Sequence, residues 1–131
     1  GIMNYIANAF SLQMVPSDHI ILCTDISPEE VPRTVKSCIG HTDTAAIVSA
    51  MLGFEIPANR ESITLKSGDY LYVAQVVGGR LPEGTTTLPD GVSIIFKRVF
   101  VIDRNKLWSC CNRPDCVIQA FYPEGFPSND K

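Results

Sequence analysis

The sequence predicts a single α/β domain built on a mixed sheet of about five strands flanked by helices. At 131 residues and 45% hydrophobic content, the chain can bury one core but is too short for two ordinary domains. Runs with strand character occur on both sides of a region with helix signals, and this alternation favours an α/β architecture. We expect the domain to span residues 3–103 and residues 104–131 to form an appendage.

Five runs rich in β-branched and aromatic residues predict the strands. They are residues 4–10, 18–26, 61–65, 70–77 and 92–102. The turn residues between the third and fourth runs predict a hairpin, and a loop rich in glycine and proline leads to the last run. A loop of that length without secondary structure is uncommon in a small domain, so it favours a functional role.

A first helix is expected after the second strand. Ser27 can cap it, Pro28 suits its first position, and Glu30 is placed to complete a capping box. Pro32 removes a backbone donor one turn later, so this helix should be short or irregular near its start.

A second helix should follow, capped by Thr42 or Asp43 and terminated by Gly53. Its apolar positions recur at helical spacing. They are Ala46, Ile47, Ala50 and Met51. We therefore expect this helix to pack on the sheet.

Composition and charge exclude several classes of protein. A net charge of −3 argues against a broad basic face that binds long nucleic acid. The apolar runs fall far short of the roughly 18 residues of a membrane-spanning helix, and no secretory signal pattern is present, so a cytoplasmic protein is expected. No acidic and histidine residues have metal-ligand spacing, so neither a metal nor another cofactor is expected.

The appendage carries three of the five cysteines and several aromatic residues. The cysteines are Cys23, Cys38, Cys110, Cys111 and Cys116, and none has CxxC spacing. Free thiols in a reducing cytosol are the simplest interpretation, and a metal or redox role of the last three stays open. The aromatic residues are Trp108, Phe121, Tyr122 and Phe126. They offer apolar surface for a protein partner, or they pack back on the domain or on a second subunit.

Two local patterns suggest chemistry on a phosphate. His41 directly precedes a helix N-terminus, which is a ready anion site, and histidine exchanges protons near neutral pH. In the loop, Gly78 and Gly79 allow close approach of the backbone, Arg80 can pair bidentately with phosphate, and Glu83 follows. The alternatives are a solvated helix flank and a surface Arg–Glu pair, which contributes little stability.

Five motifs, in order, resemble the viral type III anti-CRISPR ring nuclease family, whose members destroy cyclic tetra-adenylate. They are Tyr5-Ile6-Ala7-Asn8-Ala9-Phe10-Ser11-Leu12, Ile39-Gly40-His41-Thr42-Asp43-Thr44-Ala45-Ala46, Pro57-Ala58-Asn59-Arg60, Gly68-Asp69 with Val73-Ala74-Gln75, and Gly79-Arg80-Leu81-Pro82-Glu83-Gly84. The resemblance implies a homodimer with the cyclic nucleotide lying across its two-fold axis, where four identical nucleotides present equivalent phosphates to two copies of one site.

The resemblance also implies roles for individual residues. His41 would be the catalytic histidine, Glu83 the assisting carboxylate and Arg80 a phosphate-binding member of the catalytic set. The substrate pocket would be lined by Asn8, Ser11, Arg60 and Gln75. Asp43 is unexpected beside a phosphate, and we expect it to cap the helix or to accept from a ribose hydroxyl.

We expect metal-independent cleavage in which a ribose 2′-hydroxyl attacks its own phosphate. His41 would protonate the departing 5′-oxygen, and Glu83 would either orient His41 or receive the 2′-hydroxyl proton. The products would be linear adenylates with 2′,3′-cyclic phosphate ends.

Two other classes of function remain as alternatives. A sponge would sequester the messenger without cutting it, but binding alone does not need both His41 and Glu83. A regulatory module would bind DNA or a protein. The acidic net charge and the lack of a basic helix count against DNA, whereas a protein partner stays open.

Overall fold

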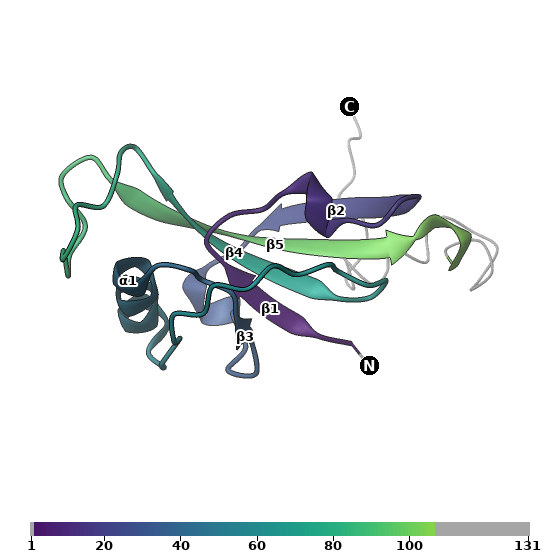
Figure 1. Ribbon diagram of the computed structural model, residues 1–131, viewed down its shortest axis with the longest axis horizontal. Helices are drawn as coiled ribbons and strands as arrows, with labels where there is room; N and C mark the ends of the chain where they lie inside the picture. Colours follow the sequence, from purple (N-terminus) through teal and green to yellow (C-terminus); the bar gives the residue numbers. More distant parts are fainter. Residues whose placement is uncertain (1, 107–131) are drawn as a thin grey trace, which may run out of the picture.

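A mixed five-stranded sheet organises residues 2–106, the part of the chain that the computed structural model describes (Figure 1). The strand order is β2–β5–β4–β1–β3. The strands are β1 (Asn4–Ala7), β2 (His19–Asp25), β3 (Lys36–Ser37), β4 (Tyr70–Val77) and β5 (Ser93–Asp103). β1 pairs in parallel with β3 and β4, whereas β5 pairs antiparallel with β2 and β4. The predicted fold class is confirmed.

Strand β4 lies at the centre of the sheet and is covered on both faces. Its residues Leu71, Tyr72, Val73 and Ala74 are all buried. Because strand side chains alternate between faces, Tyr72 and Ala74 join the core on one side, and Leu71 and Val73 join a second core on the other. A central strand with both faces covered explains this unbroken apolar run.

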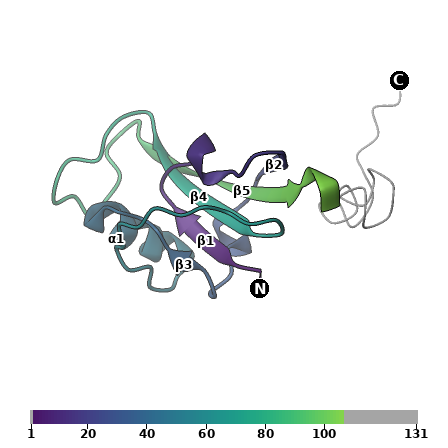
Figure 2. The same cartoon turned by 45° about the vertical axis from the view of Figure 1, so that its right-hand side comes forward.

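Helix α1 (Thr42–Leu52) covers one face of the sheet, and the chain around the short 3₁₀ helix η1 (Leu12–Met14) crosses the other (Figure 2). From α1, Ala45, Ile47 and Val48 are buried in the first core. The second core is closed partly by Met14 and by Leu65, which is fully buried. The helix predicted after residue 41 therefore packs on the sheet as expected.

The start of α1 differs from the prediction in one respect. His41 takes the N-cap position with extended backbone, and its side chain makes no capping hydrogen bond. Thr42 and Asp43 lie inside the helix, so the prediction that one of them caps it is wrong. Gly53 ends the helix with φ +81°, as predicted from its freedom to adopt left-handed backbone.

The helix predicted at residue 27 is a single 3₁₀ turn, η2 (Pro28–Glu30). The predicted capping box of Ser27 and Glu30 is present, and in it the Ser27 backbone N–H donates to the Glu30 carboxylate at 2.8 Å. Pro32 has no backbone N–H with which to continue the helix, and this accounts for the shortness of η2. The chain then forms β3, a two-residue strand that was not predicted.

The strand predicted at residues 61–65 is wrong, and so is the hairpin it would form with β4. This segment runs beside η1 instead, where the Leu65 N–H donates to the Met14 carbonyl at 2.7 Å. The turn that follows is present and is held by Asp69. The buried Asp69 carboxylate accepts from the backbone N–H groups of Met3 and Lys66, each at 2.9 Å.

The expected free thiols are present at the two cysteines that the structure describes, the exposed Cys23 and the buried Cys38. Burial raises the pKa of the Cys38 thiol. The three remaining cysteines and the four aromatic residues of the predicted appendage lie outside the described residues. Within residues 2–106, no helix is long and apolar enough to cross a membrane.

Candidate functional site

A pocket of about 630 Å³ opens where the N-terminus of α1 meets the end of β4 and the loop between β4 and β5. It is lined by His41, Asp43, Thr44, Val76, Gly79, Arg80, Leu81 and Glu83. All three residues predicted to be catalytic are among them, although His41 is about 40 positions from the other two. The fold thus brings the two sequence patterns into one site.

The helix N-terminus gives this pocket a positive end. The first backbone hydrogen bond of α1 runs from the Ala45 N–H to the His41 carbonyl at 2.9 Å, and the His41 side chain caps none of the preceding N–H groups. The first-turn N–H groups of a helix have no partner within the helix. Together with the helix dipole, they favour an anion at this position.

The loop of residues 78–91 is held in a defined conformation, and it leaves and rejoins the sheet at neighbouring positions. Gly78 has φ +86°, and a Cβ atom on it would lie 2.1 Å from the Gly91 carbonyl oxygen, so the two ends of the loop lie side by side with no room for a side chain. Leu81 and Leu88 pack against the core on the α1 side. These contacts hold Arg80 at the pocket.

Within the loop, a tight turn presents Glu83 at the rim of the pocket. The Thr85 N–H donates to the Pro82 carbonyl at 3.2 Å, and Gly84 has φ +81°, as the third position of such a turn requires. The Gly84 N–H donates to Asp43 Oδ2 at 2.8 Å. The carboxylate of Asp43 is therefore bonded to the loop.

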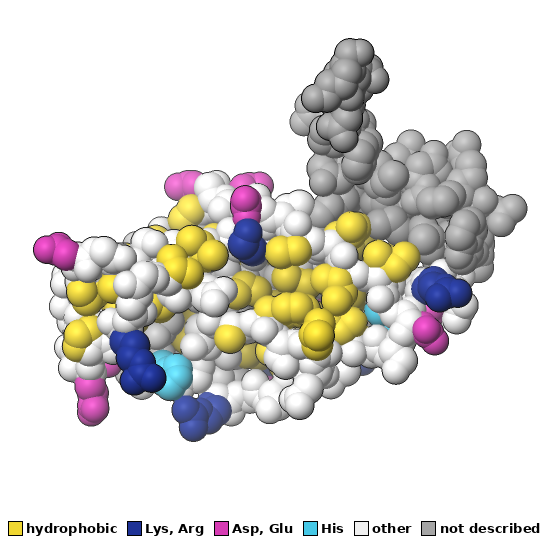
Figure 3. Space-filling view, turned by 90° about the horizontal axis from the view of Figure 1, so that it is seen from above, with side chains coloured by type: hydrophobic (Ala, Val, Ile, Leu, Met, Phe, Trp, Pro, Cys, Tyr) yellow, Lys and Arg dark blue, Asp and Glu magenta, His cyan; other side chains and the backbone are white. Residues whose placement is uncertain are grey.

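Arg60 lies beside the chain that leads into the pocket. A Cβ atom on Gly40 would lie 3.4 Å from the Arg60 Nε atom, so the arginine side chain packs over the residue that precedes His41. The Asn59 N–H donates to the Ile39 carbonyl at 2.7 Å and fixes this arrangement. Figure 3 shows a histidine with basic side chains on both sides of it near one end of the molecule.

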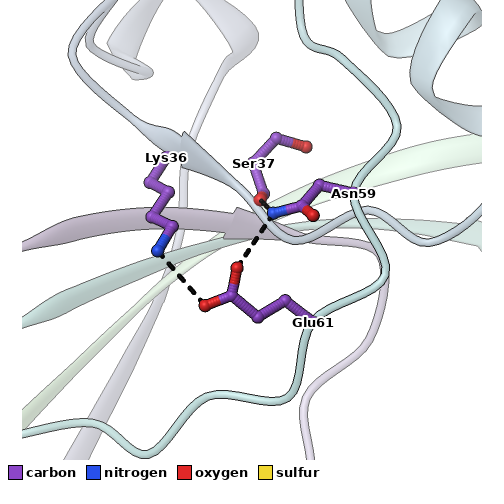
Figure 4. Close-up of polar contacts among 4 residues, drawn as sticks. All are labelled: Lys36, Ser37, Asn59 and Glu61. Carbon is purple, nitrogen blue, oxygen red and sulfur yellow. Dashed lines mark hydrogen bonds and ion pairs between the residues drawn. The ribbon is translucent and has the colours of Figure 1, made fainter.

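A polar network supports the segment that carries Arg60 (Figure 4). Asn59 Nδ2 donates to the Ser37 carbonyl at 2.8 Å and to the Glu61 carboxylate at 3.1 Å. Lys36 Nζ lies 3.2 Å from the same carboxylate. Hydrogen bonds from Asn59 and Lys36 lower the pKa of Glu61, and Glu61 raises the pKa of Lys36. The network joins the chain on both sides of Arg60 to β3.

The other predicted substrate-binding residues do not line this pocket. Gln75 is exposed and lies between Ala74 and Val76 on β4, so its side chain is on the opposite face from theirs. Ser11 caps η1 by accepting from the Gln13 N–H at 3.2 Å, and it lines a separate pocket of about 410 Å³. Asn8 follows the end of β1 and is half-buried.

Sequence reasoning did not single out Thr44, Val76 or Leu81 as pocket residues. Thr44 is buried in the first turn of α1, and the other two also belong to the core around the pocket. The sequence around Val76 and Leu81 indicates only that they are apolar residues that can join a core. Among the described residues, no three His, Cys, Asp or Glu side chains are grouped as metal ligands would be.

The fold and pocket define a small α/β protein with a mixed sheet and a pocket at one helix N-terminus. The chain belongs to the STIV B116-like family, which it matches over residues 4–91. This segment holds β1 to β4 and all seven predicted site residues.

One relative from a Sulfolobus virus places the chain in a viral protein family, and a solved structure from another Sulfolobus virus shares its fold. The chain is 32% identical over 88 residues to uncharacterized protein 26 of Sulfolobus islandicus filamentous virus (isolate Iceland/Hveragerdi), covering 63% of this chain and 74% of that protein. Its structure is similar to that of B116 of Sulfolobus turreted icosahedral virus, with a TM-score of 0.63 and 22% identity. That match covers 75% of this chain and 98% of B116, and it shows a shared fold.

Proposed function

We propose that this protein is a ring nuclease that binds cyclic tetra-adenylate across a homodimer and cleaves it, thereby antagonising type III CRISPR signalling. The observation that carries the proposal is the pocket in which His41, Arg80 and Glu83 surround the N-terminus of α1. A proton donor, a guanidinium and a positive helix end are the groups that phosphodiester cleavage needs around one phosphate.

In the proposed reaction, a ribose 2′-hydroxyl attacks the adjacent phosphorus atom and the bond to the 5′-oxygen breaks. His41 gives its proton to the departing 5′-oxygen. Arg80 and the first-turn N–H groups of α1 stabilise the charge that builds on the phosphate oxygens. The 2′-hydroxyl proton passes to Glu83 or to solvent, and the product ends in a 2′,3′-cyclic phosphate.

The size of the pocket supports a ligand shared between two copies. A volume of about 630 Å³ is in the range that encloses one drug-sized molecule, and a ring of four nucleotides is larger. Gln75 and Ser11 lie outside this pocket. In a two-fold dimer, two pockets would hold opposite parts of the ring, and surfaces outside one pocket could contact the rest of it.

The test is incubation of the purified protein with cyclic tri-, tetra- and hexa-adenylate in EDTA, followed by separation of the products. We expect linear adenylates with 2′,3′-cyclic phosphate ends from the tetramer, because the ribose supplies its own nucleophile. Strict dependence on added divalent metal would contradict this mechanism. Tight binding without any product would instead identify a sponge.

A further inference from the structure

Asp43 places a carboxylate in the pocket that we propose for a phosphate. It is half-buried at the second position of α1, two residues after His41 and directly before the buried Thr44. A negative charge there repels an anionic ligand, and simple Coulomb repulsion would weaken binding. The structure shows what the carboxylate contacts: Oδ2 accepts the Gly84 N–H at 2.8 Å.

The contact joins two parts of the site that are 41 residues apart. Gly84 directly follows Glu83 in the turn closed by the hydrogen bond from Thr85 to Pro82. Arg80, which also lines the pocket, precedes that turn and is next to Leu81, which packs against the core. Holding the Gly84 N–H therefore fixes the distance of the turn, and of Glu83 with it, from the start of α1.

We propose that Asp43 is a positioning residue, which holds the turn of residues 82–85 against α1 so that Glu83 and Arg80 face His41. The inference rests on the proposed function of this pocket. The positive end of the helix offsets part of the cost of the aspartate charge beside a phosphate. A hydrogen bond from a backbone N–H to a carboxylate is stronger than one to a neutral acceptor, which favours aspartate for this contact.

Two substitutions separate this role from a simple effect of charge. Asp43→Asn removes the charge but keeps an oxygen that can accept the Gly84 N–H. Asp43→Ala removes both. If the carboxylate acts only through its charge, both variants bind the anionic ligand more tightly and to the same extent. If it positions the turn, only the alanine variant loosens the loop.

The experiment measures amide hydrogen exchange of residues 79–90 and single-turnover cleavage of cyclic tetra-adenylate in both variants. For Asp43→Ala we expect exchange at Gly84 to quicken and the cleavage rate constant to fall, each about 10-fold, the scale expected for one lost hydrogen bond to a charged group. Exchange in β4 should not change. Asp43→Asn should recover most of both properties.

Asp90→Ala is the matched control, because Asp90 is an exposed aspartate in the same loop that does not line the pocket. It should behave like the wild type in both measurements. Any result in which Asp43→Ala is not more impaired than Asp43→Asn overturns the inference. If the wild-type protein leaves the nucleotide intact, the proposed function fails, and the exchange of residues 79–90 still decides whether Asp43 holds the turn.

Discussion

His41 and Arg80 approach the pocket from different elements, and they differ in how a bound phosphate would use them. His41 begins a helix, so its exposed side chain lies next to the N–H groups that favour the anion. Arg80 extends from the loop and carries a fixed positive charge that attracts the phosphate before, during and after cleavage. We therefore expect substitutions of the two residues to affect different kinetic quantities.

His41→Ala should lower the single-turnover rate constant about 100-fold or more and leave the affinity for cyclic tetra-adenylate largely intact, because a general acid acts only in the transition state. Arg80→Ala should lower both the rate constant and the affinity. Cleavage and equilibrium binding, measured side by side on each variant, check the contrast.

The chain provides a matched control for the first substitution. His19, the other histidine, lies at the start of β2 with Nδ1 bonded to the Ser17 carbonyl at 2.9 Å, and it does not line the pocket. His19→Ala should cleave at the wild-type rate. Wild-type cleavage by His41→Ala would return His41 to the role of a solvated helix flank.

Much of the candidate site could be predicted from the sequence because its parts are locally encoded. A histidine before a helix and an arginine in a glycine-rich loop each show their chemistry within a few residues. The hydrogen bond between Asp43 and Gly84 could not be predicted, since its partners are 41 residues apart and no local pattern marks them. For Gln75, the motif indicated a role, but only the strand register shows that it lies on the other face.

The segment of residues 61–65 contributes to the stability of the fold more through the burial of a side chain than through backbone pairing. Leu65 is 0% exposed within the second core, whereas its neighbour Thr64 is exposed. Leu65→Ala should lower the free energy of unfolding by about 3 kcal/mol, in the range for a buried leucine that leaves a cavity. Thr64→Ala should change it by less than about 0.5 kcal/mol. Urea unfolding of both variants gives the comparison, and equal effects would contradict it.

Errors in predicting elements have physical causes that can be traced to particular residues. Glu61 to Leu65 has the composition of a strand, but it borders η1, which offers no strand to pair with. Strand β3 has only two residues, which are too few for an alternation of apolar and polar side chains to be recognised. β4 was predicted with the correct bounds because its eight residues include an unbroken apolar run at the centre of the sheet.

At the scale of the whole molecule, the face opposite α1 is the best candidate for contact with a second copy. Hydrophobic side chains gather over the middle of the face seen in Figure 3. Ile95, paired in register with Gln75, and Ile21 on β2 are both more than a third exposed and share the face of the second core. Exposed apolar side chains that gather on one face are typical of interfaces between proteins.

We predict that the protein is a dimer in solution and that Ile95→Glu, which buries a charge in such an interface, makes it monomeric. Ala46→Glu is the control, since Ala46 is an exposed apolar residue of α1 and does not line a pocket with Ile95. Light scattering measures the mass of each protein. A monomeric wild type whose mass stays the same when cyclic tetra-adenylate is added would contradict the prediction.

The close approach of Gly78 to Gly91 places the start and the end of the intervening segment side by side at the end of the sheet. Because the chain leaves and rejoins the sheet at these two glycines, a change of length in residues 85–90, after the turn that Asp43 holds, need not shift the register of β4 against β5. Natural variation can then alter ligand choice while the fold stays constant. Among related viral proteins, we expect lengths to diverge here sooner than in any strand.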